Sequence, residues 1–171
     1  MGREYLASKI TSGRTTANPK ATWWFRHCQS IVRYLVFTGF PDSKGIDEVR
    51  AEALALAEEW DHRMPSSFPK GAMGRHVTLE LGIVDAVRRK DPKTVETIGD
   101  LLVEDVSRQV DQLGTLDPSM PKDRLKRLVD EHVVHFMERV RCDIEKTETD
   151  ACNQKAEANT MALVDFTLEW F

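Results

Sequence analysis

Apolar residues recur every three or four positions along most of this chain, which is the spacing of helices with one buried face. In residues 46–64 they are Ile46, Val49, Ala53, Leu56, Ala57, Trp60 and Met64. In residues 91–113 they form a narrower stripe of Val95, Ile98, Leu102, Val106, Val110 and Leu113. Asp91 suits an N-cap, Pro92 a first helical position and Gly114 a C-cap. The pattern predicts a helix over each segment.

Two further segments show the same spacing. A helix is predicted from about Ala21 to the loop "TGFPDSKG", with an apolar face of Trp24, Cys28, Ile31 and Leu35. A long helix is predicted over residues 122–147, with a seam of Leu125, Val129, His132, Phe136, Val140 and Ile144. A short helix is also expected over residues 3–12.

The pattern leaves two segments open between helix and strand. In "RHVTLELGIVDAVRRK" every second residue from Val77 to Ile83 is apolar, as in a strand, but Leu79, Ile83 and Val87 also fit one helical face. A helix is favoured because good helix formers follow with no turn signal between them. Residues 151–171 predict a final helix, although alternation over 164–170 leaves a strand possible.

The sum of these elements is an all-α bundle of about five to six helices. A chain of 171 residues, 41% hydrophobic and 30% charged, can bury a real core. We expect a flexible basic N-terminal arm over residues 1–20 and a single helical-bundle domain over residues 21–171.

Charge is distributed unevenly along the chain. Residues 1–41 contain six basic residues and one acidic residue, whereas the whole chain carries a net charge of −4. A basic arm before an acidic body is typical of contact with nucleic acid or an acidic partner, or of attraction between the chain's own two parts. One hypothesis is therefore a non-enzymatic, oligomeric binding or regulatory protein.

The cysteines and the apolar runs of the sequence indicate in which cellular compartment the protein lies. Cys28, Cys142 and Cys152 are an odd number with no close pair, so a disulfide is not expected and the thiols are predicted to be inert. No run is apolar enough to span a bilayer, because Arg26, His27 and Arg33 interrupt the most apolar one. These features favour a cytoplasmic protein with no membrane insertion.

The run "TLELGIVDAVRRKDPKTVETIGDLLVE" carries a recognisable arrangement of acidic and basic residues. Asp85-Ala86-Val87-Arg88-Arg89 and Ile98-Gly99-Asp100-Leu101-Leu102 resemble the core of the all-α nucleoside triphosphate pyrophosphohydrolases of the MazG type. In that family two antiparallel helices supply four carboxylates that hold magnesium against the substrate triphosphate. Carboxylate and phosphate oxygens are the ligands that Mg²⁺ prefers.

The resemblance implies a Mg²⁺-dependent nucleotide pyrophosphohydrolase that assembles as a homo-oligomer. Glu80, Glu96 and Asp100 are the implied metal ligands, and Arg88 and Arg89 the implied phosphate-binding residues. Ile83 and Thr97 stand where the family has its other two glutamates, which leaves open whether the site is degenerate. No catalytic residue is assigned. The alternative is that Glu96, Asp100 and Glu104 form the wet side of a surface helix.

A second cluster of possible ligands lies in "DEHVVHFMERVRC". His132 and His135 are three residues apart on a helix and have glutamates one turn away. Such spacing can bind zinc or iron if another helix completes the set, and His76 with Glu80 is the obvious donor pair. The alternative is that His132 is a seam residue and His135 a surface residue paired with Glu131 or Glu138.

Overall fold

The computed structural model describes residues 19–38, 45–145, 147 and 149–170, and these form six helices with no strand among them. They are α2 (Pro19–Thr38), α3 (Ile46–Arg63), α4 (Ala72–Arg88), α5 (Pro92–Leu116), α6 (Lys122–Glu145) and α7 (Thr149–Trp170). The predicted all-α bundle of five to six helices is confirmed. The predicted helix over residues 3–12 and all but the last two residues of the N-terminal arm lie outside the described residues.

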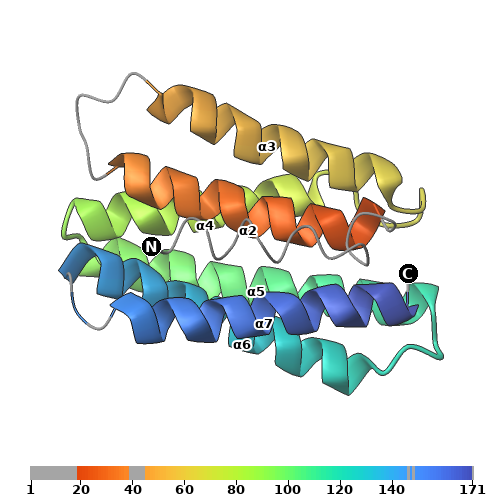
Figure 1. Cartoon of the computed structure of the whole chain (residues 1–171). Helices are drawn as coiled ribbons and strands as arrows, with labels where there is room; N and C mark the ends of the chain where they lie inside the picture. The colour runs from red at the N-terminus through yellow and green to blue at the C-terminus, as the bar shows by residue number, and fades with distance from the viewer. Residues whose placement is uncertain (1–18, 39–44, 146, 148, 171) are drawn as a thin grey trace.

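The helices run side by side along their length (Figure 1). Helices α2, α4, α6 and α7 pack in a closed ring, with α2 on α4, α4 on α6, α6 on α7 and α7 on α2. Helix α3 packs against α2 and α4 from outside this ring, and α5 packs against α4 and α6. The centre of the four-helix ring is therefore covered on every side by backbone.

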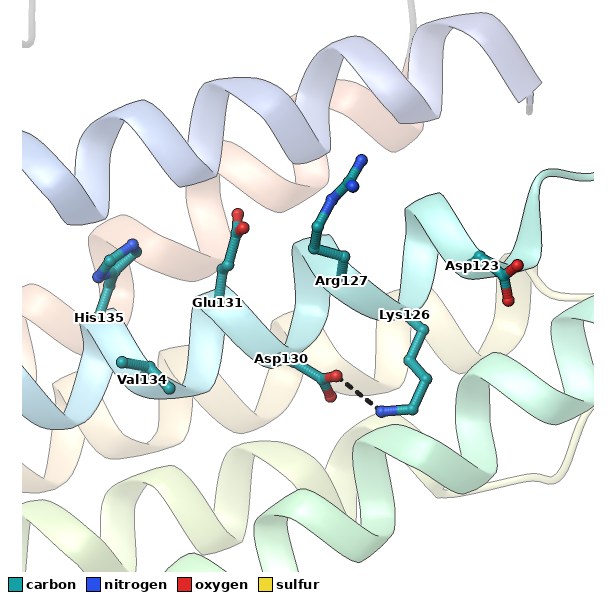
Figure 2. A pocket seen from close by; sticks show the side chains of 7 residues that line it. All are labelled: Asp123, Lys126, Arg127, Asp130, Glu131, Val134 and His135. Carbon is teal, nitrogen blue, oxygen red and sulfur yellow. Dashed lines mark hydrogen bonds and ion pairs between the residues drawn. The ribbon is translucent and has the colours of Figure 1, made fainter.

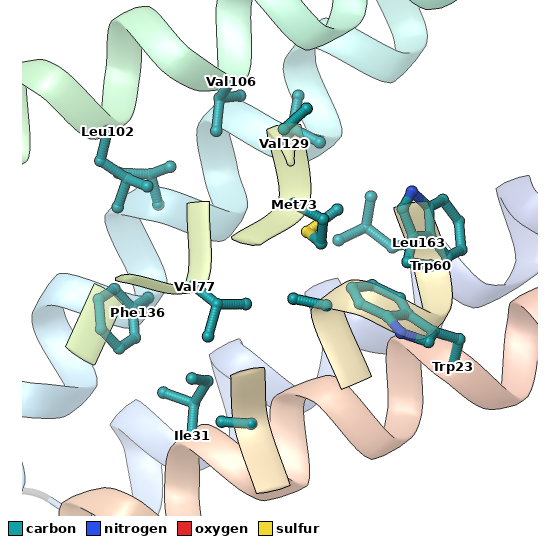
Figure 3. Close-up of a cluster of buried hydrophobic side chains, with 14 of the residues drawn as sticks. Trp23, Ile31, Trp60, Met73, Val77, Leu102, Val106, Val129, Phe136 and Leu163 are labelled. Carbon is teal, nitrogen blue, oxygen red and sulfur yellow. The ribbon is translucent and has the colours of Figure 1, made fainter. Parts of the chain in front are cut away.

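The core runs through the ring and beneath the two outer helices (Figure 3). Trp23 of α2 packs against Trp60 of α3, with ring centroids 4.4 Å apart. Val77 of α4 is completely buried, which stabilises the fold by about 1.5–3 kcal/mol relative to an exposed valine. The apolar stripes predicted for α3 and α5 face this core, so the periodicity identified their buried sides correctly.

The start of α5 follows the sequence signal, but its end does not. Asp91 accepts a hydrogen bond from the Thr94 amide at 3.1 Å, and Pro92 is the first helical residue, as predicted. The prediction of Gly114 as the C-cap is wrong, because α5 continues to Leu116 and is capped by Asp117 in an extended conformation. No left-handed residue ends this helix, so a glycine there has no conformational advantage.

Both ambiguous segments are helical. Residues Ala72–Arg88 form α4, as favoured, and Thr149–Trp170 form α7, so the strand alternative for residues 164–170 is wrong. Alternating apolar residues fit a helix here because α4 is covered on several sides by α2, α3, α5 and α6. No helix within the described residues is both long and apolar enough to cross a membrane.

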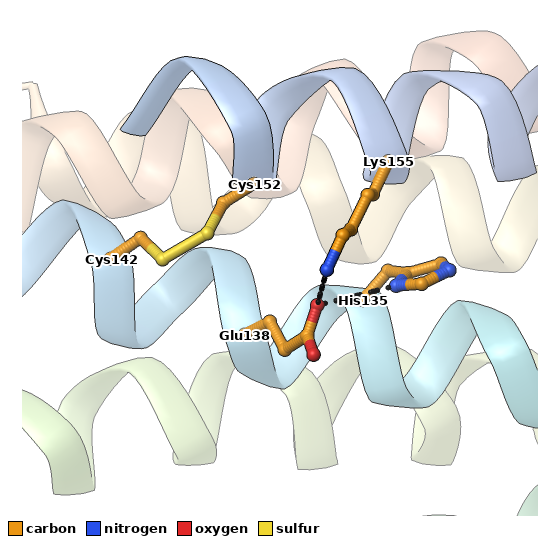
Figure 4. The surroundings of a disulfide bond; sticks show 5 residues. All are labelled: His135, Glu138, Cys142, Cys152 and Lys155. Carbon is orange, nitrogen blue, oxygen red and sulfur yellow. Dashed lines mark hydrogen bonds and ion pairs between the residues drawn. A yellow bond between two sulfur atoms is a disulfide. The ribbon is translucent and has the colours of Figure 1, made fainter. Parts of the chain in front are cut away.

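The expectation that all three cysteines are free thiols is wrong for two of them. Cys142, in the last turn of α6, and Cys152, in the first turn of α7, form a disulfide across the connection between the two helices (Figure 4). Their Cα atoms are 6.6 Å apart, within the range that a disulfide spans. The bond removes the cysteine argument for a reducing compartment, and the cytoplasmic location stays a prediction. Cys28 is a free thiol.

Candidate metal centre

Three histidines and one glutamate meet inside the four-helix ring. Each of His27, His76, Glu80 and His132 offers one ligand atom, and these atoms all lie within 4.8 Å of one another. The four residues are between 0% and 8% exposed. They come from three helices, with His27 on α2, His76 and Glu80 on α4, and His132 on α6.

The Glu80 carboxylate is the centre of this cluster. Its Oε2 lies 3.2 Å from Nε2 of His27, and its Oε1 lies 3.3 Å from Nε2 of His132 and 3.5 Å from Nε2 of His76. Ligand atoms about 2.1 Å from a tetrahedral ion are about 3.4 Å apart. The spacing around Glu80 therefore matches a site for one ion. The ligand atoms that lie farther apart, up to 4.8 Å, would reach the same ion after shifts of about 1 Å per side chain.

Local helix geometry aims each side chain inward. His76 and Glu80 are one turn apart on α4 and so share its buried face. His132 lies between Val129 and Phe136 on the buried seam of α6. On α2, the Trp23 indole ring stacks on the His27 imidazole, with centroids 5.0 Å apart and planes 7° from parallel. The Trp23 indole N–H donates to the Leu56 carbonyl of α3, which fixes the ring that orients His27.

Burial and the central charge set the protonation of the cluster. Burial lowers the pKa of His27, which favours the neutral imidazole. Burial also acts to lower the pKa of His76, but the negative charges of Glu80 and Asp105 outweigh it and raise that pKa. Burial acts to raise the pKa of Glu80, yet the surrounding histidines hold it well below its usual range. The lowered pKa favours the ionised form of Glu80, and the raised pKa favours the charged form of His76.

Asp105 of α5 stands behind His76 and is 2% exposed. Its Oδ2 lies 3.9 Å from Nδ1 of His76 and accepts a 2.6 Å hydrogen bond from Gln109 Nε2. The Arg75 guanidinium pairs with Oδ1. At 3.9 Å the Asp105–His76 contact is electrostatic and too long for a hydrogen bond. A histidine bound to a metal commonly donates its other N–H to such a carboxylate, which Asp105 would accept after a small shift of the His76 ring.

Several buried atoms of the cluster lack hydrogen bonds. Within the described part of the chain, the two ring nitrogens of His76 and Oε2 of Glu80 make no hydrogen bond of acceptable geometry. Buried polar atoms are almost always satisfied, and an exception calls for a bound ion or water. A cation at the centre of the cluster satisfies both Nε2 of His76 and the carboxylate.

A cavity of about 40 Å³ adjoins the cluster inside the ring. Three of the four candidate ligands line it, and His76 is the one that does not. The rest of the lining comes from α2, α6 and α7 and is mainly apolar: Cys28, Ile31, Val32, Leu35, Phe136, Arg139, Val140, Ala156 and Thr160. Burial raises the pKa of Cys28 to about 12, so this side chain stays a neutral thiol.

The predicted magnesium ligands are not brought together. Glu80 lies in the buried cluster, whereas Glu96 and Asp100 are exposed on α5, as is Glu104. Neither Glu96 nor Asp100 belongs to a group of metal-ligating side chains among the described residues. A magnesium site at these positions, completed by substrate or by a second subunit, stays a prediction.

The predicted phosphate-binding arginines lie at the end of α4. Arg88 is half-buried, and its Nη2 donates to the Leu35 carbonyl in the last turn of α2 at 2.7 Å. This hydrogen bond ties α4 to α2. Arg89 is exposed. A role of either residue in binding phosphate stays a prediction.

The two histidines of α6 have separate roles. His132 joins the buried cluster together with His76 and Glu80, the donor pair noted in the sequence. His135 is half-buried, and its Nδ1 lies 3.5 Å from Glu138 Oε2, where Lys155 also pairs (Figure 4). This is the surface pairing that the sequence left open for His135.

Two members of the site were missed from the sequence. His27 was read only as a polar interruption of an apolar run, although it lies one turn from both Trp23 and Ile31, two buried residues. Asp105 was not considered, although it lies one turn from Leu102 and one turn from Gln109 on the buried side of α5. In both cases a polar residue in register with an apolar stripe was the available signal.

A larger, open hollow of about 370 Å³ lies along the surface of α6 (Figure 2). It is lined by Asp123, Lys126, Arg127, Asp130, Glu131, Val134 and His135. Lys126 and Asp130 form an ion pair of 2.6 Å one turn apart. Such exposed pairs contribute only about 0.3–0.5 kcal/mol, and the mixed charges are those of an ordinary solvated face.

Comparison of the chain with protein-family models, with curated proteins and with solved structures gives no match.

Proposed function

We propose that this protein is a metalloprotein that holds one divalent transition-metal ion in the core of its helical bundle. His27, His76 and His132 supply imidazole nitrogens, and Glu80 supplies a carboxylate oxygen. The observation that carries the proposal is the convergence of these four buried side chains, from three helices, within the 4.8 Å that one ion can bridge.

The donor set selects the class of ion. Three nitrogens and one oxygen suit Zn²⁺, Fe²⁺, Mn²⁺, Co²⁺ or Ni²⁺, whereas Mg²⁺ prefers an all-oxygen set. This centre shares Glu80 with the predicted magnesium site but takes a different class of ion. The Mg²⁺-dependent pyrophosphohydrolase, the homo-oligomer and binding of nucleic acid by the basic arm stay separate predictions.

A proton is the competing occupant of the cluster. With His76 protonated between Glu80 and Asp105, the buried charges are balanced without any metal. Binding of a divalent ion displaces this proton, because a histidine must be deprotonated to act as a ligand. Metal analysis distinguishes the two occupants directly.

The test is metal content followed by a thermal shift. Protein purified without chelator is expected to contain one transition-metal ion per chain by plasma mass spectrometry. After stripping, returning the ion at about 100 times its Kd adds about 2.7 kcal/mol to the free energy of unfolding and raises Tm by about 5–11 °C.

Matched histidine variants locate the ion. His76→Gln is expected to abolish binding, while His62→Gln leaves it unchanged, because His62 is exposed at the end of α3. A protein that contains no ion, takes up none of the five cations and keeps its Tm in chelator would refute the proposal. The cluster would then be a buried network held by a proton.

A further inference from the structure

The small cavity beside the cluster indicates what the metal ion would bind, and this inference rests on the metal proposal above. Its lining includes His27, Glu80 and His132 but not His76. The cavity therefore lies on the side of the cluster away from His76, toward α2, α6 and α7. Four protein ligands close a tetrahedral ion such as Zn²⁺. An ion that takes five or six ligands, such as Fe²⁺, would keep a further position, and the hollow is the side on which that position would lie.

The size of the cavity excludes most substrates. A water molecule takes about 10–15 Å³ of such a volume, so 40 Å³ holds about three atoms of that size. Sites for nucleotides and other drug-sized ligands have about 300–1,000 Å³. Only a ligand of two or three non-hydrogen atoms fits without rearrangement of the core.

The chemistry of the lining favours an uncharged ligand. Ile31, Val32, Leu35, Phe136 and Val140 offer only carbon, and the Cys28 thiol is neutral and accepts a hydrogen bond from Thr160 Oγ1 at 3.4 Å. Arg139 is the one cationic side chain in this lining apart from the candidate ligands. An uncharged diatomic molecule enters the apolar part of this lining readily, whereas an anion would depend on pairing with Arg139 and the metal ion.

We infer that the metal ion has an open coordination position that faces this cavity and binds an uncharged diatomic molecule of the size of dioxygen or nitric oxide. The protein contributes the ion, a dry surrounding and a size limit. This assigns the site to gas binding or to reactions of a small gas at the metal.

The experiment uses the full chain loaded with Fe²⁺ without oxygen, with iron content measured first and nitric oxide as the probe. Wild-type protein is expected to form one ferrous nitrosyl per iron, detected by its half-integer-spin electron paramagnetic resonance signal. Ala156→Leu adds three carbons to a residue that lines the cavity. It is expected to retain iron and to bind nitric oxide at least about tenfold more weakly.

Ala158→Leu is the matched control, since Ala158 is exposed on the same helix and does not line the cavity. Ala156→Val is the milder variant, to be used if circular dichroism shows that the leucine disrupts the fold. Equal nitric oxide binding by wild type and by a folded, iron-loaded Ala156 variant would overturn the inference.

Other outcomes separate this inference from the metal proposal. Iron uptake without a nitrosyl signal shows that the metal centre has no open position. This outcome overturns the gas-binding inference and leaves the metal proposal standing. A protein that binds Zn²⁺ but no iron also overturns it, because an uncharged diatomic needs an electron-rich ion. Binding of azide without binding of nitric oxide contradicts the inference that the ligand is uncharged. A protein that binds no ion refutes both proposals together.

Discussion

Replacing Asp105 with asparagine tests the metal centre without touching a ligand. The side chain keeps its shape and can still contact Gln109 and Arg75, but it loses the negative charge that lies 3.9 Å from Nδ1 of His76. With an ion on Nε2 of His76, a small shift of the ring would let Nδ1–H donate to Asp105, which would increase the donor strength of Nε2. Loss of such a partner lowers metal affinity by about 10–100-fold, which corresponds to about 1.4–2.7 kcal/mol.

A second effect of the same substitution has the opposite sign. Burial acts to lower the pKa of His76, and Glu80 and Asp105 together raise it. Removing the Asp105 charge lowers this pKa and so weakens competition from the proton. That gain disappears once the pH is well above the His76 pKa, so the loss of donor strength is seen by itself at a pH high enough that the Kd no longer changes with pH.

The assay is a competition titration of the apo-protein with Zn²⁺ and a coloured chelator at that pH. Asp100→Asn is the control, because it makes the same chemical change at an exposed position on α5. We expect Asp105→Asn to raise the Kd by about 10–100-fold and Asp100→Asn to leave it unchanged. A Kd for Asp105→Asn equal to or below that of wild type would refute the role given to Asp105.

Further predictions concern protons, the α6 histidines, the disulfide and magnesium. Metal affinity is expected to fall about tenfold per pH unit below the raised pKa of His76, because one proton must leave; an affinity independent of pH in an isothermal titration contradicts this. His132→Gln should abolish metal binding while His135→Gln keeps it, as measured by metal content; equal losses would place the site elsewhere. Reduction of Cys142–Cys152, whose members are 10 residues apart, should lower the free energy of unfolding by up to about 2.7 kcal/mol in a urea titration, and an unchanged midpoint counts against the bond. If the pyrophosphohydrolase resemblance holds, nucleoside triphosphates with Mg²⁺ will release pyrophosphate, and a nucleotide panel without turnover ends that hypothesis.

The sequence by itself determined the helices. Asp91 and Pro92 start α5 through contacts with their own neighbours, and apolar spacing over a few turns identifies which side of each helix is buried. These signals are local, because each one depends only on residues within a single helix or next to its end. Gly114 shows their limit, because a glycine is compatible with a helix end but does not enforce one.

Three of the four candidate ligands could be anticipated for the same reason. His76 and Glu80 are one turn apart, so their shared face follows from a single helix, and His132 stood out on an apolar seam. The sequence could not show that all three meet His27, because Glu80 and His132 are 52 residues apart and belong to different helices.

Tertiary structure decided the convergence. A ligand set depends on the rotation and the sliding of three helices relative to one another, to within about an ångström, and these are fixed by packing across the whole core. The same packing turned Asp105 toward His76, left Asp100 in solvent and placed Cys142 within reach of Cys152. The apolar periodicity of one helix contains no information about how far that helix slides along its neighbour, because the pattern would be the same at any such position.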